Sequence, residues 1–150
     1  MSYRDGNWSQ RFGALGDESE AKFDEMFPAH HKSGLNRPPM RVSDVDPLLR
    51  NLPDRMVHDR FIECLGFGRD RVAKFKVEKL RQQLRWSAIC PVSYFVYDKT
   101  KNESYLADIG EWWLAAIRHG KYGSFESDGN EYIGLHVDHF PAGSLLEDAA

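Results

Sequence analysis

The stretch that decides the fold is Pro53-Asp54-Arg55-Met56-Val57-His58-Asp59-Arg60-Phe61-Ile62-Glu63-Cys64-Leu65-Gly66. Two short extended runs flank His58-Asp59, so the stretch is predicted to form a tight β-hairpin. In this register Val57 lies opposite Arg60 and Asp54 lies opposite Glu63. Directly opposed residues of an antiparallel pair share a face, with Cβ atoms about 4.5–5.5 Å apart. Two carboxylates that close repel each other, and a divalent cation with oxygen ligands is the usual remedy.

Outward from the hairpin, the apolar pattern predicts helices that alternate with strands. The unit from Arg60 through Tyr97 reads as strand, helix, strand, which favours a right-handed parallel crossover. The expected class is therefore α/β with a mixed sheet. The other predicted elements are a helix from an Asp17 cap to about Phe27, a helical turn over 46–51, a helix over 70–86, strands over 91–98 and 104–107, a helix over 109–119 and a strand over 130–140.

The chain of 150 residues has the size of one ordinary domain. We expect a single domain over 1–150, with a loose N-terminal arm over 1–12, a core over 17–140 and a tail over 141–150. The net charge of −3 argues against a protein that coats nucleic acid by its overall charge, although it permits a local basic face.

The two cysteines, Cys64 and Cys90, are expected to be buried free thiols in a reducing compartment. The N-terminus is polar and unlike a signal peptide. No apolar run approaches the roughly 18 residues that span a membrane. We therefore expect a cytoplasmic protein without a membrane partner.

The acids of the hairpin suit metal-dependent cleavage of a phosphodiester. Such chemistry needs carboxylates to hold one or two hard cations, a metal to polarise the phosphate and activate water, and a basic side chain to stabilise developing charge. Asp54, Glu63 and the basic segment that follows them would supply these parts.

At these residues the chain resembles the PD-(D/E)xK nuclease superfamily, which includes restriction enzymes, Holliday-junction resolvases and phage recombination nucleases. Pro53-Asp54 stands for the PD, Glu63-Cys64-Leu65 stands for the (D/E)xK, and Glu20 looks like the glutamate of the first helix. The chain is also similar to small endonuclease-like proteins of actinobacterial phages, on Gly66–Asp70, Lys74–Leu80 and Phe95–Asp98.

The resemblance implies a restriction-endonuclease-like mixed sheet flanked by helices, in a phage-encoded protein that acts in a bacterial host cell. It implies Mg²⁺ or Mn²⁺ bound by Asp54, Glu63, the backbone carbonyl of Cys64, and Glu20. The activity would be hydrolysis of DNA, with branched or recombination intermediates as candidate substrates. Nucleases of this fold often act as homodimers, so a homodimer is a further expectation.

One position departs from the family pattern, because Leu65 replaces the lysine of the motif. Either the lysine has moved to the crossover helix, or the site is degraded and the protein binds nucleic acid or a host protein without cutting. Lys74, Lys76 and Lys79 are candidates for a moved lysine, and Lys76 is the preferred one because Lys74 would lie further round, on the solvent face.

The segment from Arg69 to Arg85 holds seven basic and two acidic residues, a local net charge of +5. This asymmetry favours a surface that faces phosphates, although a solvated helix face with charge pairs would look the same. The residues predicted to contact nucleic acid are Arg69, Arg71, Lys74 and Lys79. For the acids, the ordinary alternative is that Glu20 and Glu63 simply point to water.

Overall fold

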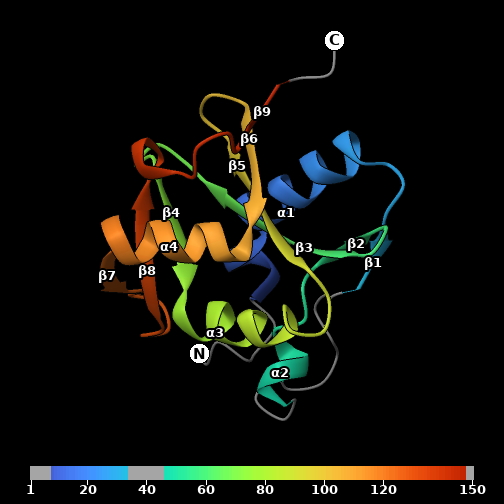
Figure 1. Cartoon of the computed structure of the whole chain (residues 1–150). Helices are drawn as coiled ribbons and strands as arrows, with labels where there is room; N and C mark the ends of the chain where they lie inside the picture. Colours follow the sequence, from blue (N-terminus) through green and yellow to red (C-terminus); the bar gives the residue numbers. More distant parts are fainter. Residues whose placement is uncertain (1–7, 34–45, 148–150) are drawn as a thin grey trace.

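The computed structural model describes residues 8–33 and 46–147 (Figure 1). The helices are α1 (Trp8–Met26), α2 (Pro47–Arg50), α3 (Val77–Trp86) and α4 (Ile109–His119). The strands are β1 (His31–Lys32), β2 (Arg55–Val57), β3 (Arg60–Phe67), β4 (Val72–Lys76), β5 (Val92–Asp98), β6 (Glu103–Asp108), β7 (Lys121–Ser124), β8 (Glu131–His136) and β9 (Leu145–Leu146). Among the described helices, none combines the length and the apolar character needed to cross a bilayer.

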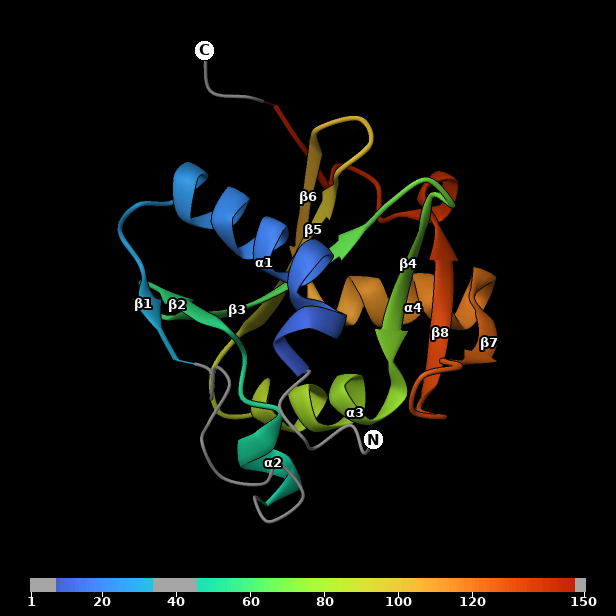
Figure 2. The same cartoon turned by 180° about the vertical axis from the view of Figure 1, so that it is seen from behind.

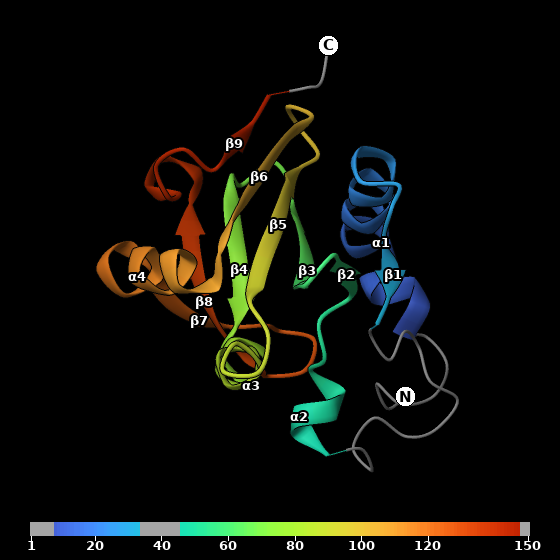
Figure 3. The ribbon, with the colours of Figure 1, turned by 45° about the vertical axis from the view of Figure 1, so that its right-hand side comes forward.

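The strands form two sheets. The main sheet has the order β1-β2-β3-β5-β6-β9, and the small sheet has the order β4-β8-β7. The β3–β5 pair is parallel and the other neighbours in the main sheet are antiparallel. Figure 3 shows α1 on one side of the main sheet, with α4 and the small sheet on the other. The predicted α/β class with a mixed sheet is confirmed.

The predicted hairpin has the expected register. Val57 pairs with Arg60, and Arg55 pairs with Ile62, which places Asp54 one residue before the last pair. His58 has a φ of 55°, a left-handed conformation that suits a two-residue turn between twisted strands. The hairpin forms from local signals, because the turn and the alternation of its two arms agree.

The predicted helix over 70–86 is wrong in its first part. Residues Val72–Lys76 form β4, and the helix begins only at Val77. Ala73 and Phe75 are buried at 0% and 2% exposure while their neighbours are half-buried, which is the two-residue period of a strand. This strand leaves the main sheet to pair with β8. The lysines at 74 and 76 therefore lie on a strand rather than on the crossover helix.

The predicted N-terminal arm and tail also need correction. Helix α1 begins at Trp8, so Asp17 lies inside it and residues 8–12 are helical, while residues 1–7 lie outside the described part. Gly13 and Gly16 lower the helix propensity here, which obscured the first half of the helix. In the tail, Leu145–Leu146 form β9 on the edge of the main sheet.

The two faces of β3 pack against different helices. Ile62 and Cys64 pack with Phe23 of α1 and with Phe95, and α1 covers this face of the main sheet (Figure 2). Phe61 and Phe67 belong to the larger cluster on the opposite face, which includes Leu80 of α3 and Trp112 of α4. Since side chains alternate along a strand, Glu63 points to the face that α3 covers.

Candidate functional site

Glu63 is the centre of a buried polar network beneath α3. Its side chain is only 3% exposed, although the residue carries a carboxylate. Lys79 Nζ forms an ion pair with Glu63 Oε1, and Gln83 Nε2 donates a hydrogen bond of 2.8 Å to Glu63 Oε2. Lys79 and Gln83 are four residues apart on α3, so they lie on the same face of the helix. Both oxygens of the buried acid are therefore satisfied from one helix.

Tyr94 fixes the orientation of Gln83. The Tyr94 hydroxyl donates a hydrogen bond to Gln83 Oε1, and both side chains are buried. Because the amide oxygen accepts from Tyr94, the amide nitrogen is the atom that faces Glu63. Tyr94 lies directly beside Glu63 in the β3–β5 register. The residues of this chain of hydrogen bonds come from three separate elements, β3, α3 and β5.

Asp54 directly precedes β2, and its side chain lies beside β3 at the point where the pairing between the two strands ends. Asp54 Oδ2 accepts a hydrogen bond of 3.0 Å from the Cys64 backbone N–H. This N–H is the next one along β3 that points toward β2 after the Arg55–Ile62 pair. In an extended residue the carbonyl points to the same side as the N–H, so the Cys64 carbonyl also faces this edge. Two oxygen donors, the Asp54 carboxylate and the Cys64 carbonyl, thus meet here.

Glu20 lies on the α1 side of the sheet, where Arg55 holds it. Arg55 Nη1 is 3.0 Å from Glu20 Oε1, and Arg55 Nε is 2.8 Å from Asp24 Oδ1. The Arg55 side chain is 4% exposed, so this is a largely buried ion-pair cluster. The structure therefore brings Glu20 near Asp54 but gives it a cationic partner of its own, on the opposite face of the sheet from Glu63.

The acids act on one another electrostatically. Burial and the nearby Asp54 raise the pKa of Glu63, and Lys79 and Gln83 oppose this rise. Burial and Asp54 likewise raise the pKa of Glu20, against the effect of Arg55. Burial alone would lower the pKa of Lys79, but Glu63, Asp54 and Glu20 together raise it. Asp54 is thus the acid that connects the two clusters.

The oxygen donors at this edge suit a hard cation. Within residues 8–33 and 46–147, no three side chains of His, Cys, Asp or Glu are grouped as a ready metal site. Mg²⁺ does not need such a cage, because it commonly binds one or two carboxylates and keeps several waters or substrate oxygens. Asp54, Glu63 and the Cys64 carbonyl are oxygen donors of the type that Mg²⁺ prefers, and the charge of Asp54 acts on Glu63, whose present cationic partner is Lys79.

Lys76 does not occupy the position expected for the helix lysine. It lies on β4, and its ammonium is 5.8 Å from the centroid of the Phe125 ring. Burial and the nearby Lys79 lower its pKa. The lysine that reaches Glu63 is Lys79, because α3 begins at Val77 and places residues 79 and 83 over the strand.

The four residues predicted to contact nucleic acid lie on different elements and have different partners. Arg71 forms an ion pair with the buried Asp98, and Lys79 is paired with Glu63. Lys74 Nζ is 3.2 Å from Asp70 Oδ2 and lies 5.5 Å from the centroid of the Tyr132 ring. Arg69 is exposed. The division follows from the missed strand, because a strand and a helix replace the single basic helix that was predicted.

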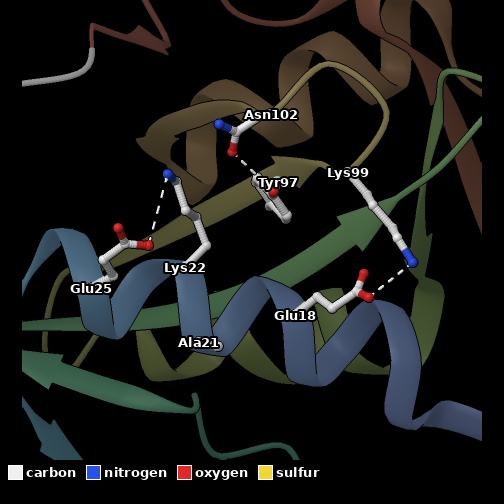
Figure 4. A pocket seen from close by; sticks show the side chains of 7 residues that line it. All are labelled: Glu18, Ala21, Lys22, Glu25, Tyr97, Lys99 and Asn102. Atoms are coloured by element: carbon white, nitrogen blue, oxygen red, sulfur yellow. Dashed lines mark hydrogen bonds and ion pairs between the residues drawn. The ribbon is translucent and has the colours of Figure 1, made fainter.

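A groove with a volume of about 490 Å³ lies away from this site, between α1 and the end of β5 (Figure 4). Its charged side chains are paired, since Lys99 Nζ is 2.8 Å from Glu18 Oε1 and Lys22 Nζ is 4.0 Å from Glu25 Oε2. The groove shares no lining residue with the Glu63 network. Because its lysines form ion pairs with glutamates away from Glu63, substitutions of these lysines serve as controls for substitutions of Lys79.

The two cysteines differ in how deeply they are buried. Cys64 and Cys90 are free thiols as predicted, but only Cys64 is buried.

Three residues of these clusters, Gln83, Tyr94 and Arg55, were not predicted from the sequence as functional residues. The spacing of four between Lys79 and Gln83 was the one local signal that could have drawn attention to Gln83.

Comparison with protein-family models, with curated proteins and with solved structures finds no match for this chain.

Proposed function

We propose that this protein is a Mg²⁺- or Mn²⁺-dependent DNA endonuclease whose site is built on Asp54, Glu63 and Lys79. The observation that carries this proposal is the contact between Lys79 and Glu63. The helix that follows the hairpin delivers an ammonium group to the second acid, and it thereby compensates for Leu65 in the motif position.

The roles of the residues follow from their surroundings. Asp54, Glu63 and the Cys64 carbonyl would hold the metal, which when bound would polarise the phosphate and lower the pKa of a bound water. Gln83 keeps Glu63 in one orientation, and Tyr94 keeps Gln83 in turn. Lys79 provides a positive charge for the phosphate oxygens as negative charge develops on them.

The order of elements supports the same proposal. A first helix, a hairpin with one acid on each side, a crossover helix and a parallel strand follow one another as α1, β2–β3, α3 and β5. This is the arrangement that the sequence resemblance implies for a nuclease core. Strand β4, between the hairpin and α3, is an addition that pairs into a separate sheet.

A second candidate function is a nuclease-fold protein that binds DNA or a host protein without cutting. The observation that favours it is that both oxygens of Glu63 already have partners within the protein, Lys79 and Gln83. In that case the network is a stabilising element of the core, and its acids have no role in binding.

Cleavage assays with supercoiled plasmid and with a four-way DNA junction, each with Mn²⁺ and with EDTA, separate the two functions. We expect cutting with Mn²⁺, no cutting with EDTA, and a loss of about a hundredfold or more for Asp54→Asn, Glu63→Gln and Lys79→Met. Lys99→Met is the matched control, because it breaks a lysine–glutamate pair in the distant groove. An intact substrate under all conditions, or equal cutting by all variants, would reject the endonuclease proposal.

A further inference from the structure

We infer that the Lys79 ammonium is the resident cation of the acid cluster, and that a divalent metal binds there only by displacing Lys79 from Glu63 Oε1. The inference rests on the proposed metal site and concerns the regulation of that site. It makes Lys79 a competitor of the metal in the resting protein, in addition to its proposed role toward the phosphate.

The ammonium of Lys79 lies at the buried acid Glu63. Lys79 Nζ is paired with Glu63 Oε1, and the charges of Asp54 and Glu20 also act on this ammonium. Asp54 lies beside Cys64 on the hairpin, whereas Glu20 lies on the opposite face of the sheet and has Arg55 as its own partner. A cation that binds Glu63 Oε1 would lie close to where Lys79 Nζ lies now, so the two positive groups would repel each other.

The two oxygens of Glu63 are held differently. Oε2 accepts from Gln83, which is 0% exposed and is itself fixed by Tyr94. Oε1 is paired with Lys79, whose side chain is 35% exposed, whereas the Glu63 side chain is 3% exposed. The approach from solvent to Glu63 therefore passes along the lysine, and Oε1 is the oxygen that can change its partner.

The side chain of Lys79 is of a type that can exchange one acceptor for another. Lysine carries a compact ammonium on a flexible four-carbon stem, so it can leave a carboxylate and bind a new acceptor without moving the backbone. A phosphate that approaches from solvent offers such an acceptor. Metal binding should therefore be weak for the protein alone and stronger when a phosphodiester is present, because the displaced ammonium then gains a partner.

Isothermal titration calorimetry with Mn²⁺ alone, at pH 8 and without DNA, tests the competition. We expect Lys79→Met to bind Mn²⁺ about tenfold more tightly than the unsubstituted protein, because it removes a positive charge from the site. Lys99→Met should bind as the unsubstituted protein does. Equal or weaker binding by Lys79→Met, or no Mn²⁺ binding by any of the three, overturns the inference.

A second measurement uses the unsubstituted protein and so does not depend on the folding of a variant. Pulse labelling with acetic anhydride, read by mass spectrometry, reports how accessible each lysine amine is. We expect saturating Mn²⁺ to increase the labelling rate of Lys79 several-fold and to leave that of Lys99 unchanged. An unchanged or slower rate at Lys79 overturns the inference.

The results also separate the inference from the proposed function. If Mn²⁺ releases Lys79 but no DNA is cut, the displacement is correct and the endonuclease proposal is wrong. If DNA is cut but Lys79→Met does not bind Mn²⁺ more tightly, the endonuclease proposal is retained and the displacement is wrong.

Discussion

The guanidinium of Arg71 is paired with the carboxylate of Asp98, whose side chain is completely buried. Asp98 Oδ1 also accepts hydrogen bonds from the backbone N–H groups of Thr100, at 2.9 Å, and Lys101, at 3.3 Å. Arg71 directly precedes β4, and Asp98 is the last residue of β5. The pair therefore links the main sheet to the small sheet at one corner of the protein.

Loss of this link should destabilise the fold strongly. We expect Arg71→Met to lower the free energy of unfolding by about 3 kcal/mol, because it leaves a buried carboxylate without its cation. Urea denaturation measures the change. Arg69→Met is the control and should change stability by less than about 0.5 kcal/mol, since that side chain is exposed. Similar losses for the two variants would show that the ion pair contributes little.

The Tyr94 hydroxyl should be important for both stability and the site. Tyr94→Phe leaves Gln83 Oε1 buried without its donor, so we expect a loss of about 1–3 kcal/mol. We also expect weaker Mn²⁺ binding, because the Gln83 amide can then rotate away from Glu63. Tyr122→Phe serves as the control, since Tyr122 is 77% exposed. If Tyr94→Phe matched this control in both assays, the orienting role would be excluded.

The raised pKa of Glu63 predicts a specific pH dependence. Burial and Asp54 raise this pKa from 4.5 to about 8, so below about pH 8 the folded protein keeps on Glu63 a proton that the unfolded chain has lost, and the ion pair with Lys79 is complete only above that pH. The stability that this proton contributes is fully present below pH 4.5 and is lost as the pH rises through about 8. The unsubstituted protein should therefore lose stability relative to Glu63→Gln over this range. Urea denaturation at several pH values measures the difference, and parallel curves would contradict the prediction.

The capping box of α4 gives a prediction that is independent of the site. Asp108 accepts a hydrogen bond of 2.8 Å from the Gly110 N–H, and the Glu111 side chain accepts from the Asp108 N–H at 3.3 Å. We expect Asp108→Ala to cost about 1 kcal/mol and Asp108→Asn to cost only a few tenths, because asparagine also caps helices well. Thermal denaturation of both variants tests this prediction. An equal loss of stability in the two variants would show that the negative charge of Asp108, and not its capping hydrogen bond, causes the effect.

The parts of the fold that were predicted from the sequence are those that local signals determine. The β2–β3 register follows from a two-residue turn between alternating arms, and α4 begins at a strong cap, Asp108. The short turn α2 likewise has Asp46 as its cap, with the Leu48 N–H donating to Asp46 Oδ1. In each case the residues that specify the element lie within a few positions of one another.

The parts that were missed depend on distant partners. Strand β4 looks helical because the segment over 70–86 has no Gly or Pro and its apolar residues fit a helical spacing, and it is the pairing with β8 that accompanies the extended form. This error moved the start of α3, and so it led to Lys76 being preferred over Lys79. Tyr94 lay in a correctly predicted strand, but its role depends on how α3 packs above it. The sequence thus drew attention to Asp54, Glu63 and Lys79, but not to Gln83 and Tyr94, which complete the network around Glu63.

The pairing of β4 with β8 has a consequence for the order of events during synthesis. Val72 pairs with His136, so strand β4 waits for a partner that leaves the ribosome much later than the hairpin. Until then β4 has no partner for its backbone hydrogen bonds, and α3, which follows β4 without a break, lacks the support of a paired strand at its first turn. Pairings this distant in sequence form late. We therefore expect the contact between Lys79 and Glu63 to become fully ordered only after β8 has been synthesised.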